Sequence, residues 1–129
     1  MSTLIGSARL LLGLGAINAA IAVVLGAFGA HGLRTRLGAD MLAVWHTAVQ
    51  YHFYHALGLL LIGLVALQLP SAGVKWSGLL MCGGILIFCG SLYALALSQV
   101  RWLGAITPIG GVAFIAAWIV FAVAVFRNG

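Results

Sequence analysis

The chain has 129 residues, of which 64% are hydrophobic and only 5% are charged, and its formal net charge is +5. Because soluble domains are about half apolar and about a quarter charged, this composition excludes an ordinary water-soluble domain. The six basic residues are scattered between apolar stretches and form no cluster. A nucleic-acid footprint requires such a cluster, so we expect no nucleic-acid partner.

Four long apolar runs divide the chain. As a helix, a run of roughly 20 residues rises about 1.5 Å per residue and spans the ~30 Å hydrocarbon core of a bilayer. The runs therefore predict an all-α, integral membrane four-helix bundle that forms one domain over residues 1–129, with helices at about 8–31, 40–68, 77–98 and 107–126. Four crossings place both termini on one side of the membrane. The flanking basic residues are divided equally between the two sides and do not orient the bundle.

Small residues recur at helical spacing in the first run, namely Gly15, Ala19, Ala22, Gly26 and Gly29. Such a stripe lets a neighbouring helix approach closely, which favours association in lipid. Asn18 lies beside the stripe, and we expect it to bond to another helix because an unpaired amide in hydrocarbon is costly. A signal peptide is the alternative for this run, but the apolar core of about 21 residues exceeds the roughly 7–15 residues of that class.

The second helix is predicted to begin as an amphipathic segment at the membrane interface, with Asp40 as its N-cap. At 100° per residue, one half of its circumference is polar and aromatic, and comprises His46, Thr47, Gln50, Tyr51, Tyr54 and His55. Trp45, on the opposite half, is predicted to belong to the aromatic belt of the interface, and so is Trp102.

In the second half of the chain, residues 70–73 predict a turn, and Lys75 with Trp76 is typical of an interfacial anchor. Cys82 and Cys89 lie about 10.5 Å apart along a helix, which is too far for a disulfide bond. The last helix holds further packing glycines, Gly110 and Gly111, and a tryptophan near its middle, Trp118, which we expect to fill space opposite the glycines of the bundle.

Most hydrogen-bonding side chains lie toward the side of the membrane away from the termini. We predict that a ligand site, if the protein has one, is lined there by His31, Tyr51, His55 and Tyr93. Tyr93 lies about one turn deeper than the others, and its hydroxyl is expected to bond to His31 or His55.

Other chemistries are less well supported. His52 and His55 stand on one face and, with His31, offer a metal site, but no thiolate or carboxylate completes it. A haem usually needs histidines on facing helices. No paired carboxylates or nucleophile with a base suggest catalysis, and no acidic residue lies within a run to support proton-coupled transport. We expect no catalytic residue, metal or cofactor.

Four motifs carry a family resemblance: residues 26–31 (GAFGAH), Gln50-Tyr51 with His55, residues 90–93 (GSLY) and residues 107–111 (TPIGG). Together they resemble the YgdD-like family of small bacterial inner-membrane proteins, and the resemblance runs from about residue 10 to residue 125. It implies a four-helix protein of the bacterial inner (plasma) membrane and no established activity. His52 does not belong to the family pattern.

Three functions remain open at this point. The first is a non-enzymatic accessory, assembly or scaffold protein that acts through its polar end or small-residue faces. The expected partners of such a protein are the lipid bilayer and either further copies of the chain in a homo-oligomer or the other members of a larger membrane complex. The second is a binder of a small amphipathic molecule such as a lipid headgroup, quinone or haem. The third is an oligomeric channel or carrier for a small solute or proton.

Overall fold

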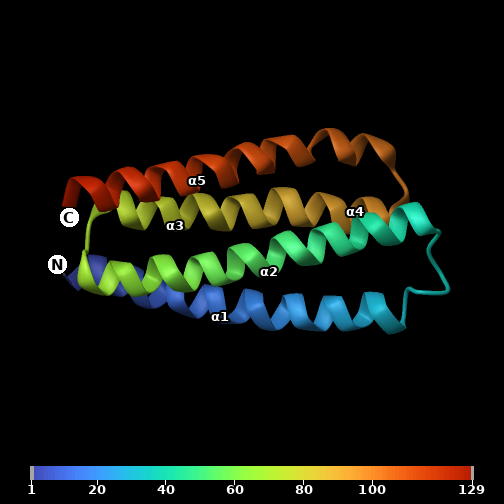
Figure 1. Ribbon diagram of the computed structural model, residues 1–129, viewed down its shortest axis with the longest axis horizontal. Coiled ribbons are helices and arrows are strands. Elements are labelled where there is room, and N and C mark those ends of the chain that lie inside the picture. Colours follow the sequence, from blue (N-terminus) through green and yellow to red (C-terminus); the bar gives the residue numbers. More distant parts are fainter. Residues whose placement is uncertain (1, 129) are drawn as a thin grey trace.

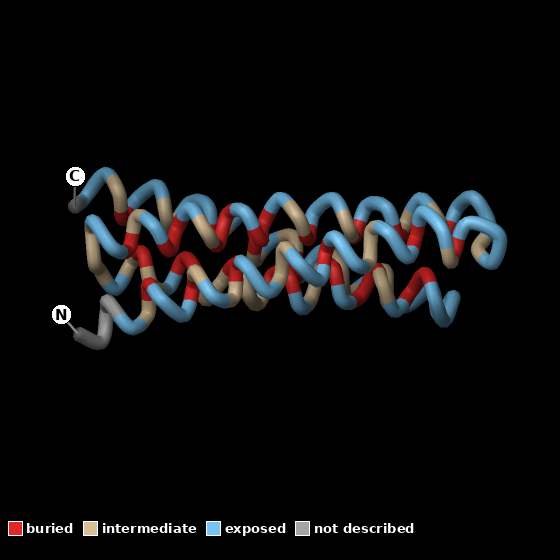
Figure 2. Tube along the Cα trace, turned by 90° about the horizontal axis from the view of Figure 1, so that it is seen from below, coloured by how far each residue is buried: buried red, intermediate tan, exposed pale blue. Residues whose placement is uncertain are grey.

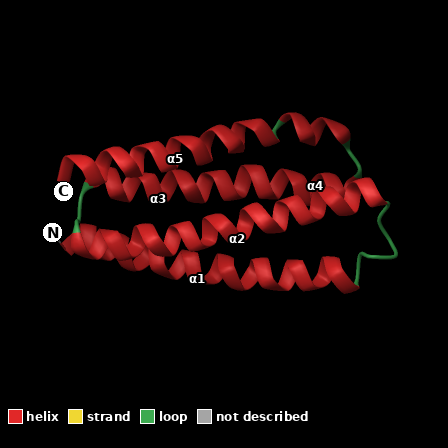
Figure 3. Cartoon of the chain, in the orientation of Figure 1, coloured by secondary structure: helices red, strands yellow, loops and turns green. Residues whose placement is uncertain are grey.

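A computed structural model describes the backbone of residues 2–128 and the side chains of residues 6–127. The chain runs back and forth in four long, roughly antiparallel rods (Figure 1), and loops lie only at the two ends of the bundle (Figure 3). α1 begins and α5 ends at the same end. The elements are α1 (Ser2–His31), α2 (Ala39–Gln68), α3 (Ala72–Gly84), the π-helix η1 (Ile85–Cys89), α4 (Gly90–Ser98), the 3-10 helix η2 (Arg101–Ala105) and α5 (Thr107–Asn128).

Four helical segments of the described chain are long and apolar enough to cross a membrane: Gly6–His31, Ala39–Gln68, Ala72–Ser98 and Arg101–Arg127. The predicted all-α membrane bundle is therefore confirmed. The outward surface of the rods is exposed along its whole length, and buried residues line the inside (Figure 2). Large apolar side chains on this outer surface, such as Leu86 at 76% exposure, suit contact with lipid rather than water.

Three helix starts differ from the prediction. α1 begins at Ser2 instead of at about residue 8. The third rod begins at Ala72, where the Ser71 hydroxyl caps it by accepting a 3.1 Å hydrogen bond from the N–H of Val74. Lys75 and Trp76 consequently lie on the helix and not in the turn before it. Asp40 is not the N-cap of α2. That position is Gly38, and Asp40 lies in the first turn, where its charge favours the positive end of the helix dipole.

The third rod is not a regular α-helix, which the sequence reading did not foresee. Between α3 and α4 the chain widens into one π-helical stretch, η1. A π-bulge inserts a residue into the helical repeat and is frequent at functional sites. α5 passes close to this stretch at Gly110. The approach is so close that a side chain at this position would meet the backbone of Phe88. α4 then ends at Ser98, and its C-cap residue, Gln99, is left-handed with a φ of 59°.

α1 rests on α2 through its small residues. A Cβ atom built on Gly15 would lie 3.0 Å from the backbone nitrogen of Leu60 and 3.1 Å from the carbonyl oxygen of Ala56. At Gly29 the same atom would lie 2.5 Å from the indole of Trp45. The two helix backbones therefore meet closely at Gly15, and at Gly29 the small-residue stripe leaves room for the Trp45 ring.

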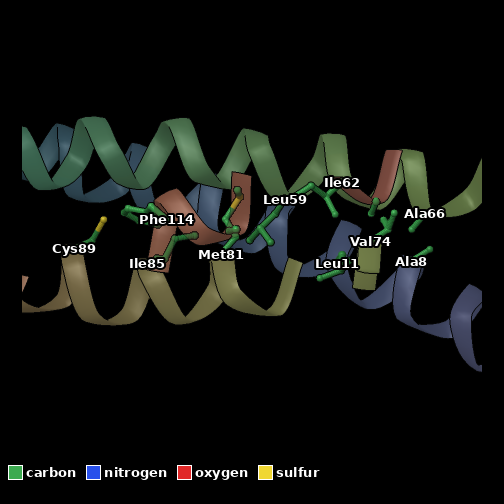
Figure 4. Close-up of a cluster of buried hydrophobic side chains, with 12 residues drawn as sticks. Ala8, Leu11, Leu59, Ile62, Ala66, Val74, Met81, Ile85, Cys89 and Phe114 are labelled. Carbon is green, nitrogen blue, oxygen red and sulfur yellow. The ribbon is translucent and has the colours of Figure 1, made fainter. Parts of the chain in front are cut away.

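Buried apolar side chains join the two helix pairs. The largest cluster draws on all four rods and includes Leu11 of α1, Leu59 and Ile62 of α2, Met81 of α3 and Phe114 of α5 (Figure 4). Trp118 lies against Gly58, where a Cβ atom would be 3.0 Å from the indole. This contact agrees with its expected space-filling role opposite a glycine.

The glycine contacts predict a paired mutational result. Gly15→Leu should lower the free energy of unfolding by about 1–3 kcal/mol, because the new side chain meets the backbone of α2 and forces the helices apart. Gly13→Leu, two residues earlier on the exposed face with open space around it, should change stability little. Thermal unfolding of both variants in mild detergent measures the difference. Equal melting temperatures would contradict the close α1–α2 approach.

Candidate functional site

Three polar side chains from three rods meet inside the bundle: Asn18 of α1, His52 of α2 and Tyr93 of α4. Nε2 of His52 lies 2.9 Å from Oδ1 of Asn18, and Nδ1 of His52 lies 2.9 Å from the hydroxyl oxygen of Tyr93. His52 is buried, with 4% of its surface exposed, and the other two side chains are half-buried. We call Asn18, His52 and Tyr93 the polar bridge.

The direction of every hydrogen bond in the polar bridge follows from one backbone carbonyl and from a neutral His52, since a charged imidazole would be costly in hydrocarbon. The amide nitrogen of Asn18 donates to the carbonyl oxygen of Leu14 at 2.8 Å, so Oδ1 is the atom that faces His52. An oxygen only accepts, and therefore Nε2 of His52 carries the hydrogen. Nδ1 is then the acceptor of a neutral imidazole, and the Tyr93 hydroxyl donates to it.

This arrangement ties three rods together without placing a charge in the membrane. An unpaired amide or imidazole would be costly in hydrocarbon, and each member of the polar bridge supplies the partner that its neighbour needs. Asn18 bonds to another helix, as the sequence analysis expected.

A crevice opens beside the polar bridge, between α1 and the η1–α4 stretch. It has a volume of about 230 Å³. Its wall on α1 is formed by Asn18, Ile21 and Leu25, its back by His52, and its opposite wall by Ile85, Leu86, Cys89, Gly90 and Tyr93. Ile21, Leu86 and Gly90 are exposed on the outer surface of the bundle, so the mouth of the crevice faces the lipid.

Contacts at both ends keep this crevice short. Toward the end where α1 begins, the Leu11 side chain lies over Gly78, where a Cβ would come within 2.5 Å of it. Toward the other end, Leu33, Trp45 and Ala96 form a small buried cluster. Between these contacts α1 packs on α2 and leaves the η1–α4 wall uncovered.

Trp45 is buried inside the bundle and is not a residue of the aromatic belt. Its indole N–H donates a 2.9 Å hydrogen bond to the carbonyl oxygen of Leu25, and its ring lies 4.7 Å from the ring of Tyr93. With only 2% of its surface exposed it is a core residue, because the small face of α1 leaves space for a large ring from α2. Trp102, by contrast, is 66% exposed.

An aromatic stack occupies a neighbouring face of α2. The ring centre of His55 lies 3.6 Å from that of Phe114, and the two rings are almost parallel. The ring of Tyr51 stacks on that of His55, with 6.1 Å between their centres. Nδ1 of His55 donates a 2.7 Å hydrogen bond to the carbonyl oxygen of Tyr51. These contacts explain His55 as a packed residue that joins α2 to α5.

The four side chains predicted to line one site lie in three places. His31 is exposed at the end of α1, while Tyr51 and His55 belong to the aromatic stack and Tyr93 belongs to the polar bridge. The expected partner of the Tyr93 hydroxyl, His31 or His55, was wrong. It is His52, because the side chain of Tyr93 reaches toward α1 and not toward the α5 side of α2.

His52 was considered only as a metal ligand, and its place in the polar bridge was not predicted. A signal for it existed, since Trp45, Ala48, His52, Ala56 and Leu59 recur at helical spacing and all prove buried. A polar residue within such a stripe requires a partner. Among the described residues, no three His, Cys, Asp or Glu side chains are grouped so that they would hold a metal ion.

The fold and this site define a small multi-pass membrane protein with a neutral polar centre. A family model described as a protein of unknown function (DUF423) matches residues 25–111, and the chain belongs to this family. The chain is similar to the UPF0382 membrane protein YwdK of Bacillus subtilis, with 56% identity over 115 residues that cover 88% of this chain and 94% of the relative.

Staphylococcal relatives are similar over the same extent. UPF0382 membrane protein SSP2132 of Staphylococcus saprophyticus is 53% identical over 114 residues, covering 88% of this chain and 94% of the relative. UPF0382 membrane protein SAB0533 of Staphylococcus aureus is 49% identical over 119 residues, covering 92% and 97%. These names assign a membrane location and no catalytic activity. No solved structure matches the chain.

Removal of one hydroxyl tests the polar bridge. Tyr93→Phe should lower the free energy of unfolding by about 1–2 kcal/mol, because Nδ1 of His52 loses its donor inside the bundle. Tyr54→Phe is the matched control, since the Tyr54 hydroxyl bonds only to Gln50 on the exposed surface, and it should change stability by less than about 0.5 kcal/mol. Thermal unfolding of both proteins gives the comparison. Indistinguishable losses would mean that the bridge contributes no more than a surface contact.

Proposed function

We propose that this protein is a non-enzymatic accessory protein of the bacterial inner (plasma) membrane that holds a small amphipathic molecule in the crevice beside the polar bridge. Both termini lie on one side of the membrane in this proposal, and the protein works within a homo-oligomer or a larger membrane complex. Within its family we take the chain to be of the YgdD-like type, on the four motifs that carry that resemblance.

The single observation that supports this function is a crevice with apolar walls and a polar floor that opens toward lipid. Binding sites for small molecules are mostly apolar, with a few converging polar groups. At about 230 Å³ the crevice is smaller than the roughly 300–1,000 Å³ of sites that enclose a whole ligand. It therefore suits the head of an amphipathic molecule whose tail stays among the acyl chains.

The same geometry argues against the other ligands and activities considered. Both ring nitrogens of His52 are occupied by Asn18 and Tyr93, so this histidine has no lone pair to offer a haem iron. The polar bridge runs across the bundle from rod to rod and not along it, and its last member is an amide, which does not relay protons. A proton channel through one protomer has no support in this arrangement.

The crevice can be blocked at one residue. Gly90 lines it, is exposed, has an ordinary helical conformation, and leaves open space where a side chain would grow. Gly90→Leu should therefore fill the mouth without disturbing the bundle. Gly83→Leu is the control, because Gly83 also has open space around it, lies in the same rod and does not line the crevice.

We expect wild-type protein and Gly83→Leu, extracted gently from their native membranes, to retain a small amphipathic molecule that native mass spectrometry detects. Gly90→Leu should retain at least about tenfold less, which corresponds to about 1.4 kcal/mol of binding free energy. Equal retention by all three proteins, or no retained molecule on wild type, would refute the proposed function.

A further inference from the structure

The hydrogen-bond directions in the polar bridge determine which groups remain for a ligand. The hydroxyl hydrogen of Tyr93 is donated to His52, the Nε2 hydrogen of His52 is donated to Asn18, and one amide hydrogen of Asn18 is donated to Leu14. His52 therefore offers a ligand nothing, because both of its nitrogens are used.

Among the atoms of the polar bridge that remain for a ligand, hydrogen-bond acceptors outnumber hydrogen-bond donors. The hydroxyl oxygen of Tyr93 keeps its lone pairs, and Oδ1 of Asn18 keeps one beyond that used by His52. The second amide hydrogen of Asn18 is the one strong donor left within the polar bridge. A head group that only accepts, such as a ketone, ether or oxidised quinone, leaves the Tyr93 oxygen unmatched. A hydroxyl matches the site because it donates one hydrogen bond and accepts another.

Charge narrows the choice further. The crevice lining holds no Asp, Glu, Lys or Arg, and the single acidic residue of the sequence, Asp40, is exposed in the first turn of α2. A phosphate, carboxylate or ammonium head would have to lose its hydration with no counter-charge beside it, which opposes its binding. The head group that fits is therefore neutral.

Size and wall chemistry place the rest of the molecule. A volume of about 230 Å³ corresponds to roughly eight water-sized groups of ~30 Å³ each, enough for a hydroxyl and the first few carbons behind it. Ile21, Leu25 and Leu86 then lead outward to the lipid-facing surface. A longer hydrocarbon tail leaves through the mouth and lies along the outside of the bundle.

Building on the proposed function, we infer that the crevice binds the hydroxyl head of a neutral lipid alcohol, with the Tyr93 oxygen accepting its hydrogen bond and the free amide hydrogen of Asn18 donating to its oxygen. The class includes diacylglycerols, isoprenoid alcohols and reduced quinols, which share this head chemistry. It excludes oxidised quinones, fatty acids and phospholipid head groups.

A chain-matched series of probes tests this assignment on the intact protein in nanodiscs. Hexadecanol, hexadecyl methyl ether, hexadecanal and hexadecanoate have similar tails and differ in the head. We expect hexadecanol to bind at least about tenfold more tightly than the other three, measured as bound probe by native mass spectrometry and as a rise in melting temperature. Gly90→Leu should abolish hexadecanol binding, and Gly83→Leu should leave it unchanged.

Two further experiments test whether the Tyr93 oxygen accepts the hydrogen bond and which natural lipid alcohol binds best. Tyr93→Phe should reduce the preference for hexadecanol over its methyl ether to below about threefold, while Tyr54→Phe should retain the full preference. A diacylglycerol, an isoprenoid alcohol and a reduced quinol, each added as a competitor of hexadecanol, rank the natural sources within the class.

The outcomes separate the two proposals. Binding of the ether, aldehyde or carboxylate as tight as that of hexadecanol, with all binding lost in Gly90→Leu, would overturn the alcohol assignment and leave the proposed function intact. Absence of binding by every probe and competitor to wild-type protein would overturn both. A strong alcohol preference that survives Tyr93→Phe would overturn the role of the Tyr93 oxygen, and with it the hydrogen-bond argument.

Discussion

Inside a bilayer every polar group must find its partner within the protein, and the structure is arranged around that constraint. The four rods satisfy their own backbones. The polar bridge satisfies the side chains of Asn18, His52 and Tyr93, with no charge and with a direction of hydrogen bonding set by the carbonyl of Leu14. Because lipid supplies no hydrophobic force between helices, this bridge and the close approach of α1 to α2 at Gly15 and Gly29 together hold α1 in position.

The same two features create the crevice. α1 follows α2 so closely that it does not cover η1 and α4, and the widened turn of η1 presents Cys89 and Gly90 on that uncovered wall. Asn18 and Tyr93 reach His52 from the two walls of this crevice, and all three side chains line it. No metal cluster lies among the described residues, so the proposed selection of a ligand relies on hydrogen-bond complementarity and the exclusion of charge.

Much of the fold could be predicted because it depends on composition and length. Four apolar runs separated by basic residues, Gly and Pro had to become four spans, and they did so within a few residues of the expected bounds. The exceptions are local. Ser71 caps α3 directly after Pro70, so the helix starts earlier than the apolar run alone indicates. Gly38 takes the N-cap position expected for Asp40. The π-helix has no periodic signature, because its extra residue is accommodated between glycines that favour no single geometry.

The sequence by itself determined the membrane location, the number of rods and the need of Asn18 for a partner, because each follows from the cost of exposing a peptide or amide to hydrocarbon. It also determined the small face of α1, which follows from the helical spacing of its small residues. Which histidine meets Tyr93, and where a crevice remains, was decided only by the tertiary structure. One inserted residue in η1 turns the face of every later residue in that rod by about 100°. Tyr93 is thereby aimed at His52 and α1, away from His55 and its stack on α5, and no count along the chain reveals that rotation.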